Sequence, residues 1–598
     1  MIRCSIQIAN NRLTDNEFTN VFILQEVGTH NSFEVRLRQD AQPGVLLEKT
    51  KDWIGEPITI GVEEKEDDQI QVGLAKEFFK GIVTSVSLSR RSGIAELVVR
   101  GNGPSISMDD GPHTRSFTEK GLQEIADEVL GPYGSFFSDA PVVSPENFTD
   151  IIDYCVQYKE SNFSFLDRLS DRYGEWFYYD GVQFYFGKPD GEDPIKLNFG
   201  EDGLTHFDMS VRALPGKFEI KAYDYVKHQF LSEEAPESTE LNDLGREAMK
   251  AANSKIYTEK PLVAIQSFTE KNELENIAKR REQITMDEVV FITGGSSNSK
   301  LKLGCSIEIE DQLIKDSYGT YVITKISHHI DQGGDYNNSF EAIPTEIKTP
   351  PLSKAPVPPY CEMQLAKVVD VNDDEALGRI KVEFLWQEGT GETSPWLRVA
   401  SPYTGKDKGF YIIPEVDDQV LVAFENNNPN KPYVLTGMYN GDAKPEWFDP
   451  KNHSKGFKSK GKNEWKFDDK SKSITINAPD TINMTAGKTI NVKTGGKSDS
   501  SINIDVGDGT VNIIAKKIIV KAAETFHVDS KKEALIDATT TINLDSKKEV
   551  IISGAVSVSV SSVDVKIDGT KSSKVSGGMV DVSAQGPLNA KGAIIKLN

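Results

Sequence analysis

The sequence predicts a mainly β fold with minor α content, distributed over several domains. Its 598 residues exceed the ~250–300 residues at which single cores stop growing. From residue 448 onward, apolar and polar residues alternate in short repeated units, the period-2 pattern of strands with one buried face. The segment before it, 361–447, holds several further short strand patterns, and the helical patterns lie in the first 349 residues.

The C-terminal repeat advances in steps of eight residues. Successive units are Ser473-Ile-Thr-Ile-Asn-Ala, Thr481-Ile-Asn-Met-Thr-Ala and Thr489-Ile-Asn-Val-Lys-Thr, and similar units begin at Ser501, Thr510, Thr541 and Ser562. One such strand cannot bury its apolar face alone, so neighbours must stack. A single-chain solenoid needs capping elements and longer rungs, whereas units this short fit a core shared between chains. We therefore expect an intertwined β-helix, most simply triple-stranded, in a homotrimer.

Charge also separates this segment from the rest of the chain. Residues 451–598 hold 23 Lys, no Arg and 16 Asp or Glu, a formal charge of +7, whereas the whole chain carries −23. Lysines on outward strand faces keep them soluble and oppose edge pairing. Contact with an acidic membrane surface is the alternative role for these lysines. The acidic balance of the whole chain argues against nucleic-acid binding.

The pattern of residues 361–447 predicts a small closed barrel of the OB type. Six short strands are expected, at 363–371, 378–386, 394–400, 409–414, 419–424 and 432–437. Upstream, residues 350–359 contain five prolines, so 349–360 is expected to be an extended linker.

Residues 1–348 mix strands with two predicted helices. Ser32–Arg38 alternates as a strand. Apolar spacing predicts an amphipathic helix over 118–130 and a second one from Ser161 to Gly174. A hairpin of 175–179 and 182–186, turned at Asp180-Gly181, should follow the second helix.

The OB segment resembles that of the VgrG spike family of type VI secretion, which is related to phage tail hub and spike proteins. The resemblance rests on Gly378-Arg-Ile-Lys-Val, Trp386, Trp396-Leu-Arg398-Val, Ile413-Pro414-Glu-Val, Val420-Leu-Val-Ala-Phe-Glu, Asn428-Pro429-Asn-Lys-Pro-Tyr-Val and Gly437-Met-Tyr-Asn-Gly. Two turns differ from the family pattern, at Asp417-Asp418 and at Asn427-Asn428-Pro429, but Asn tolerates the left-handed backbone that such turns use.

The N-terminal half resembles the VgrG hub in the segment 157–179 and in a strand region that contains His328, which matches a histidine of the hub pattern. The resemblance implies a hub of β-barrels with an α/β insertion. The expected order is a first hub barrel at 1–110, the insertion at 111–190, a second barrel region at 191–348, the linker at 349–360, the OB domain at 361–447 and the β-helix spike at 448–598.

The resemblance implies a structural role without enzyme activity. The homotrimer would cap a hexameric inner-tube protein (Hcp-like), contact baseplate components and transiently meet the target membrane. Its far end, near Ile594, Ile595 and Leu597, would bind a PAAR-type tip protein or carry effectors. The N-terminus lacks a secretory signal, so we expect assembly in the bacterial cytoplasm and delivery through the contractile apparatus.

Two alternatives to this role stay open. One is the same spike in an extracellular phage-tail-like particle. The other, of a different class, is a β-helix carbohydrate-binding or adhesin-like protein, although the repeat has few aromatic residues to stack on sugars.

The sequence offers no catalytic or cofactor motif, because HExxH, GxSxG, P-loop and Rossmann patterns are absent. Adjacent strand residues point to opposite faces, so His328 and His329 should not share a metal ion, and we interpret His328 as a hydrogen-bonded structural residue. The four scattered cysteines are expected to be buried reduced thiols. The sequence also stops in strand pattern, so no C-terminal effector domain is expected.

Overall fold

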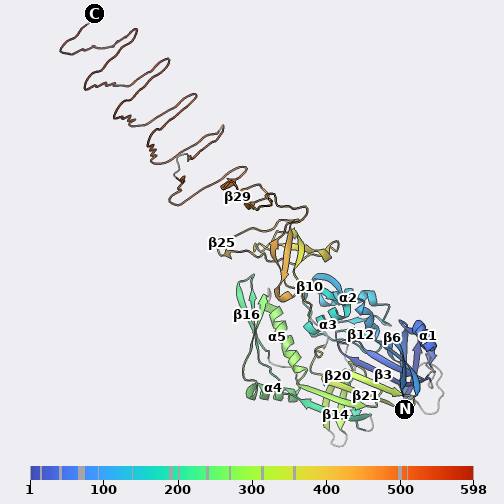
Figure 1. The fold of residues 1–598 in the computed structure, drawn as a ribbon. Coiled ribbons are helices and arrows are strands. Elements are labelled where there is room, and N and C mark those ends of the chain that lie inside the picture. The colour runs from blue at the N-terminus through green and yellow to red at the C-terminus, as the bar shows by residue number, and fades with distance from the viewer. Residues whose placement is uncertain are drawn as a thin grey trace. The chain divides into compact units, whose positions relative to one another are not determined.

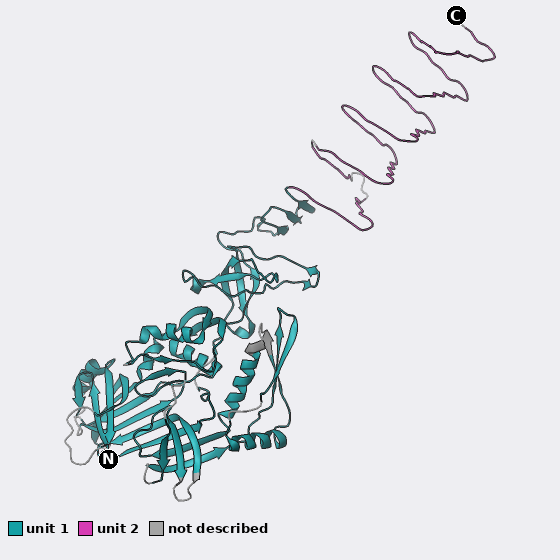
Figure 2. Ribbon diagram, turned by 180° about the vertical axis from the view of Figure 1, so that it is seen from behind, with its two compact units in different colours: residues 1–479 teal, residues 480–598 magenta. Residues whose placement is uncertain are grey.

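The computed structural model describes the whole chain except residues 1, 14–16, 39–42, 65–74, 92, 138, 188–192, 200–202, 237–240, 268–270, 312–315, 354–357, 496–500, 508, 597 and 598. The described residues form two compact units, 1–479 and 480–598, coloured separately in Figure 2. Strands predominate over helices, so the predicted mainly β class is confirmed.

One 13-stranded sheet organises the N-terminal part of the first unit (Figure 1). Its order is β14-β18-β21-β20-β3-β4-β7-β6-β5-β1-β2, and β19 pairs with both β20 and β13. The strands are β1 (Ile2–Ile8), β2 (Asn11–Leu13), β3 (Phe18–Glu26), β4 (Ser32–Leu37), β5 (Pro57–Glu64), β6 (Glu77–Arg91), β7 (Ile94–Asn102), β13 (Ile195–Asn198), β14 (Leu204–Val211), β18 (Val290–Ser296), β19 (Ser306–Asp311), β20 (Asp316–Asp331) and β21 (Tyr336–Pro344). The regions predicted as two hub barrels therefore share one sheet, because β3 pairs antiparallel with β20.

Two separate apolar cores pack against this sheet. The first contains Val35, Phe79 and Val99 together with Trp53 at the end of α1 (Pro43–Trp53). The second contains residues from β18 to β21 and Met249 of α4 (Asp243–Lys255). Each core follows the alternation of its strands: in β4, for example, every second residue is buried.

The insertion between the two halves contains both predicted helices. Its elements are η1 (Pro104–Asp109), β8 (His113–Gly121), α2 (Leu122–Leu130), η2 (Gly131–Tyr133), β9 (Val142–Val143), β10 (Ile151–Glu160) and α3 (Asn162–Tyr173). The predicted α3 boundaries are confirmed, because the Ser161 hydroxyl accepts from Ser164 N at 3.1 Å and Gly174 ends the helix with φ of +74°. The helix predicted over 118–130 is wrong at its start, since residues up to Gly121 pair with β10.

The predicted hairpin after α3 forms between β11 (Phe177–Tyr179) and β12 (Phe184–Phe186). Its connection is four residues, 180–183, longer than the predicted turn at Asp180-Gly181. The Asp180 carboxylate accepts from Val182 N and Gln183 N at 2.8 and 2.7 Å, which closes the longer loop.

A second, smaller sheet forms an arm that the sequence did not single out. It consists of β15 (Glu219–Asp224), β16 (Gln229–Glu234) and β17 (Leu262–Ser267), with α5 (Lys271–Met286) packed beside it. Phe218, Ile220 and Ala222 meet Leu274 and Ala278 in its core.

The OB region contains a four-stranded sheet of order β23-β22-β26-β27. Its strands are β22 (Gln364–Asp370), β23 (Lys381–Phe384), β26 (Gln419–Phe424) and β27 (Pro432–Gly437), and it also holds η3 (Leu385–Gln387), η4 (Glu425–Asn427) and a short hairpin of β24 (Thr404–Gly405) and β25 (Lys408–Gly409). The strand predicted at 394–400 forms only two bridges, Ile380 with Leu397 and Val399 with Val434. These bridges connect β23 to β27 and so close the barrel. The strand predicted at 409–414 is wrong beyond Gly409, where no pairing is described.

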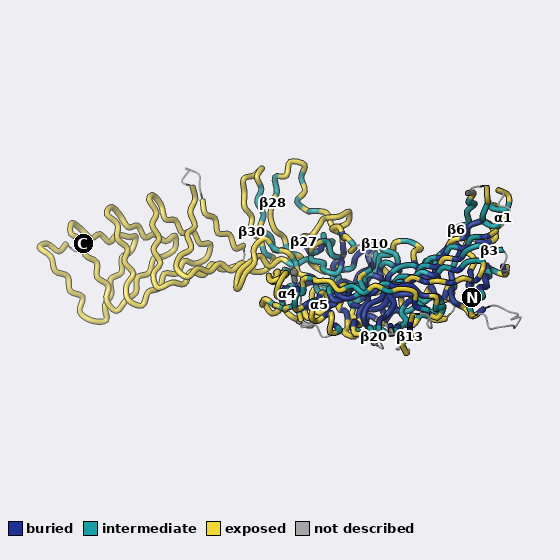
Figure 3. Tube along the Cα trace, turned by 90° about the horizontal axis from the view of Figure 1, so that it is seen from below, coloured by how far each residue is buried: buried dark blue, intermediate teal, exposed yellow. Residues whose placement is uncertain are grey.

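The repeat segment begins with a three-stranded sheet, β28 (Ser454–Lys458), β29 (Glu464–Asp468) and β30 (Ser473–Asn477). These strands belong to the first compact unit. In the second unit, the described residues follow a regular back-and-forth path in which none pairs into a strand within the chain (Figure 1). Every described residue of this unit is exposed, whereas the hub holds buried cores (Figure 3).

Candidate functional site

The first turn of the OB domain is held by one buried carboxylate. Asp373 accepts from the backbone N–H groups of Leu377 and Arg379 at 2.9 and 3.1 Å, and from the Arg379 Nη2 at 2.6 Å. Hydrogen bonding to the guanidinium lowers the pKa of Asp373 to about 2. Gly378, one of the predicted pattern residues, completes this turn with φ of +70°, which favours glycine.

The two pattern tryptophans lie in different surroundings. Trp386 is in η3 and not in a strand as predicted; its ring stacks on Phe384 and its Nε1 donates to Gln364 at 3.0 Å. Trp396 is half-buried, with the Lys381 ammonium 5.1 Å from its ring centre.

The other OB pattern residues have different physical roles. Pro429 is buried in a turn closed by Lys431 N donating to Asn428 O at 3.0 Å. Pro414 is half-buried ahead of a second turn. At Gly437 an added Cβ would meet nothing closer than 3.9 Å, so nothing in the structure explains a glycine there.

The OB domain shares a core with the hub insertion. Tyr154, Val156 and Tyr158 of β10 pack with OB residues that include Val382 and Val420. Sequence reasoning missed this contact, although the unbroken run of buried residues from Tyr154 to Tyr158 shows that both faces of β10 are covered.

Hydrogen bonds reinforce the same junction. Asn430 accepts from Val156 N at 2.8 Å, and Gln387 Nε2 donates to Ser116 at 2.8 Å. On the arm side, the guanidinium of Arg398, another pattern residue, lies 4.8 Å from the ring centre of Tyr225 in the turn between β15 and β16. Of the predicted OB residues, Trp396 and Arg398 thus lie where three parts of the first unit meet.

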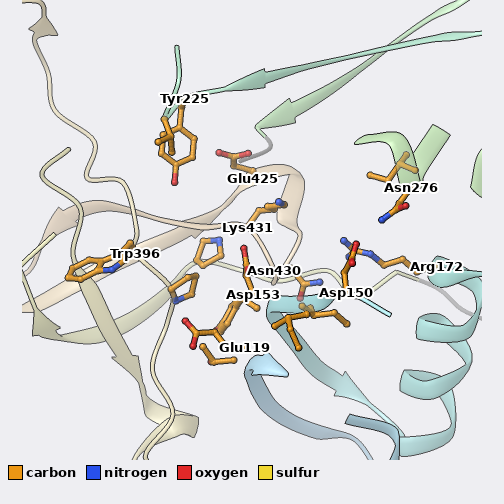
Figure 4. A pocket seen from close by; sticks show the side chains of 18 of the residues that line it. Glu119, Asp150, Asp153, Arg172, Tyr225, Asn276, Trp396, Glu425, Asn430 and Lys431 are labelled. Atoms are coloured by element: carbon orange, nitrogen blue, oxygen red, sulfur yellow. The ribbon is translucent and has the colours of Figure 1, made fainter. Parts of the chain in front are cut away.

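A cavity of about 910 Å³ lies at this junction (Figure 4). Residues from β10, α3, the arm turn, α5 and the OB loops line it, and Figure 4 shows Tyr225 and Trp396 on one side of the view and Arg172 and Asn276 on the other. Its walls carry charges of both signs. The basic lining residues include Arg172, Lys279, Arg398 and Lys431, and the acidic ones include Glu119, Asp150, Asp153 and Glu425. The described residues include no group of three metal-ligating side chains, here or elsewhere.

His328 lies in the hub sheet and is completely buried. Its Nδ1 is 2.8 Å from the Tyr336 hydroxyl and its Nε2 is 3.1 Å from Gln25 Oε1. Burial lowers its pKa to about 3, so the ring is neutral and bridges three strands. His329 contacts Asn20 instead, so the two histidines have separate partners.

The cysteines are free, and three of them, Cys4, Cys155 and Cys361, are buried as expected, whereas Cys305 is half-buried. Among the described helices, none combines the length and apolar character that crossing a bilayer requires.

The most extensive candidate surface is the second unit. Its large apolar side chains are all exposed in the described chain, and even the least exposed of them, Val506, is 44% exposed. The predicted tip residues Ile594 and Ile595 are 79% and 53% exposed, and Leu597 lies outside the described residues. An exposed aliphatic surface of this extent marks an interaction surface.

Comparison with known proteins identifies this architecture. Residues 26–334 match the model of the phage tail baseplate hub (GPD), and residues 364–439 match the type VI secretion system/phage-baseplate injector OB domain.

Curated relatives are similar over longer stretches. The chain is 22% identical to the type VI secretion system spike protein VgrG1a of Pseudomonas aeruginosa over 476 residues, covering 73% of this chain and 69% of that protein. It is 22% identical to VgrG1c of the same organism, covering 70% and 59%. It is 23% identical to the actin cross-linking toxin VgrG1 of Vibrio cholerae, covering 53% of this chain and 31% of that protein.

Two solved structures are also similar. The Francisella PdpA–VgrG complex in its lidded form has a TM-score of 0.49 and 9% identity, covering 80% of each chain. The Escherichia coli c3393 protein, a component of the type VI secretion system, has a TM-score of 0.48 and 14% identity, covering 72% of this chain and 99% of that one.

The hub and OB matches together define the chain as a component of phage-tail-like injection machinery, and the resemblance to VgrG spike proteins is confirmed. Because the hub match spans just over half of the sequence, the chain belongs to the phage tail baseplate hub family.

Proposed function

We propose that three copies of this chain form the spike of a contractile injection system. In each copy the hub and OB domain support a C-terminal segment that winds with two others into a puncturing shaft. The role is mechanical: the trimer concentrates the force of contraction on a narrow tip.

The exposure of the second unit carries this proposal. Its strand-like units alternate apolar with polar residues, yet the chain covers none of the apolar faces by itself. Burying one Val, Leu or Ile side chain is worth roughly 1.5–3 kcal/mol, so these residues strongly favour association with matching copies. Identical repeats in register provide the matching surface, and an intertwined shaft leaves no free strand edge.

The two cores of the hub support a role as an adaptor for the inner tube. Each chain supplies two apolar cores on one shared sheet. Three chains would therefore present six such cores, a number that suits a hexameric inner-tube protein of the Hcp type.

The far end of the shaft, around Ile594 and Ile595, is proposed to bind a PAAR-type tip protein or an effector. Their exposed side chains leave an apolar surface for such a cap. A VgrG protein of Francisella is solved in complex with PdpA, and this complex supports the proposal that spikes of this kind bind a partner protein. We further propose assembly in the bacterial cytoplasm and export through the contractile apparatus.

The second candidate is the same spike in an extracellular phage-tail-like particle. The OB match supports the extracellular particle as much as type VI secretion, because the matched domain is one of both type VI secretion systems and phage baseplates. Purified sheath-covered particles that carry this chain and lack membrane subunits would select the extracellular particle. The carbohydrate-binding alternative has no counterpart in the matched families.

A pair of neighbouring substitutions tests the shaft. Ile542 and Asn543 are adjacent in one repeat unit and alternate between the expected inner and outer faces. We expect Ile542→Asp to convert the trimer of the full chain to smaller species in native mass spectrometry, because a carboxylate in the apolar core is costly. Asn543→Asp adds the same charge on the outer face and should leave the trimer intact. Equal masses for both variants and the wild type would contradict an apolar shared core.

A further inference from the structure

The start of the interdomain linker is held against α3 by two carboxylates. Asp167 and Asp171 lie one helical turn apart on α3, and Ser353 lies between them. The Ser353 N–H donates to Asp171 Oδ1 at 3.0 Å, and the Ser353 hydroxyl is 2.8 Å from Asp167 Oδ2. The same hydroxyl is 3.2 Å from the Gly28 carbonyl oxygen.

The chain before Ser353 is also fixed to the hub. Thr349 is completely buried, and Trp176 Nε1 donates to the Lys348 carbonyl at 2.7 Å. Ser353 is the last residue of this fixed stretch that the structure describes, and its contacts hold the stretch on the hub.

The number of protons in this cluster depends on Asp167. Asp167 Oδ2, Ser353 Oγ and Gly28 O form two adjacent oxygen–oxygen contacts, and each contact needs one proton. An ionised Asp167 leaves only the serine proton for both contacts. A protonated Asp167 donates to Ser353 Oγ, which frees the serine to donate to Gly28. The observed arrangement is complete only with the protonated acid.

The surroundings of Asp167 favour the same state. The residue is 1% exposed, and its Oδ1 has no hydrogen-bond partner among the described residues. Among the described residues, the charged groups that face it are Asp171 on α3 and Arg280 on α5, whose Nε donates to the Asp171 backbone carbonyl at 2.7 Å. Burial, and then the charge of Asp171, raises the pKa of Asp167 to about 8, although the hydrogen bond with the Ser353 hydroxyl opposes this; burial raises the pKa of Asp171 to about 6, although the Ser353 N–H and Arg280 oppose this.

We propose that Asp167, Ser353 and Gly28 form a pH-dependent latch that holds the start of the interdomain linker on the hub. The latch is closed while Asp167 carries its proton and weakens when that proton is lost. Opening exposes Asp167 to water, where its pKa returns to the ordinary range and the proton is released. Acidification therefore strengthens the latch, and rising pH weakens it.

The difference in bound protons between the closed and the open latch sets the pH range over which the latch opens. Above pH 6, where Asp171 is ionised in both states, opening releases the single proton of Asp167. The opening equilibrium then increases up to tenfold per pH unit until about pH 8 and levels off above it.

Amide hydrogen exchange at Ser353 in the full-length assembly measures this opening, because the Ser353 N–H is held by Asp171 only in the closed state. Rates are corrected for the pH dependence of exchange in an unstructured peptide. We expect protection of Ser353 in the wild type to fall up to tenfold per pH unit from pH 6 to pH 8 and to change little from pH 8 to pH 9. A flat wild-type profile over pH 6–8 would overturn the proposal.

Three variants assign the effect. Asp167→Asn keeps a donor for Ser353 Oγ and cannot ionise, so its protection should change less than twofold over the same range. Asp171→Asn removes the neighbouring charge and should move the levelling to lower pH. Asp150→Asn, at an exposed carboxylate, should match the wild type.

Retention of the wild-type slope in Asp167→Asn would show that another group controls the opening. If that variant does not fold, the wild-type profile and the shift in Asp171→Asn decide the question, and an unshifted profile in Asp171→Asn would contradict the shared-site account.

Discussion

The Asp373 carboxylate organises the turn from Asp370 to Arg379 through bonds to three backbone N–H groups and one guanidinium. Its side chain is 3% exposed and that of Arg379 is 10% exposed, so the ion pair is largely removed from water. Removing one partner of such a pair leaves the other charge without compensation.

We therefore expect Asp373→Asn to destabilise the OB domain by about 2–4 kcal/mol at pH 7. Because the folded-state pKa is depressed, this contribution is complete above the unfolded pKa near 4 and is lost as the pH falls towards 2. Exchange of OB amides in the full chain, measured from pH 3 to pH 7, checks both the size and the direction. Asp374→Asn, at the exposed neighbour, is the control; a difference between wild type and Asp373→Asn that grows on acidification would refute the ion-pair account.

At the scale of elements, the turn between β15 and β16 connects the arm to the OB barrel. Tyr225 in this turn faces Arg398 at a ring distance of 4.8 Å, and Asp224 shapes the turn by accepting from Val226 N and Lys227 N. Tyr225 also interacts with the Arg379 side chain, so this residue should hold the arm tip on the OB barrel.

We expect Tyr225→Ala to lower amide protection in the turn 225–228 by about 2- to 5-fold, which corresponds to one partly exposed cation–π contact. The β15 and β17 amides, held by the α5 core, should not change. Phe230→Ala, which removes an exposed ring of β16 that contacts Tyr223, serves as the matched control. Unchanged protection in Tyr225→Ala would show that the arm tip is held by other contacts.

Elements with strong local signals could be predicted from the sequence. The Ser161 cap, the apolar face of α3 and the terminal Gly174 all act within a few residues, so local pattern was sufficient. The same holds for β4 and β22, where alternation reflects one buried face.

Elements decided by distant partners could not be predicted in this way. Residues 118–121 contain no apolar residue that could mark a helix face, and they pair with β10, so a distant strand sets where the helix starts. Residues 394–400 alternate like a strand, yet only two of them form bridges, because their role is to close the barrel. The shared core between β10 and the OB domain depends on residues more than two hundred positions apart.

The candidate site was predicted only in part. Trp396 and Arg398 were singled out by family pattern, and both lie at the hub–OB junction. Tyr225 and the carboxylates of α3 were missed, because their significance arises from Arg398 and from Ser353, which no local pattern connects to them.

At the scale of the whole molecule, the chain combines a self-sufficient first unit with a second unit that has no core of its own. The first unit buries its apolar residues in four clusters among the described residues. The second exposes Ile, Val and Leu throughout, on units that repeat every eight residues at their start. A chain of this design completes its fold only by assembly, and the copies must be identical for the repeats to match.

A cryo-EM reconstruction of the full-length assembly, computed without imposed symmetry, tests this claim most directly. We predict three chains related by threefold symmetry, with Ile542, Leu544 and their equivalents facing a common axis and the lysines facing outward. A second unit that forms a closed coil from one chain, with its aliphatic side chains covered by that chain alone, would contradict the account.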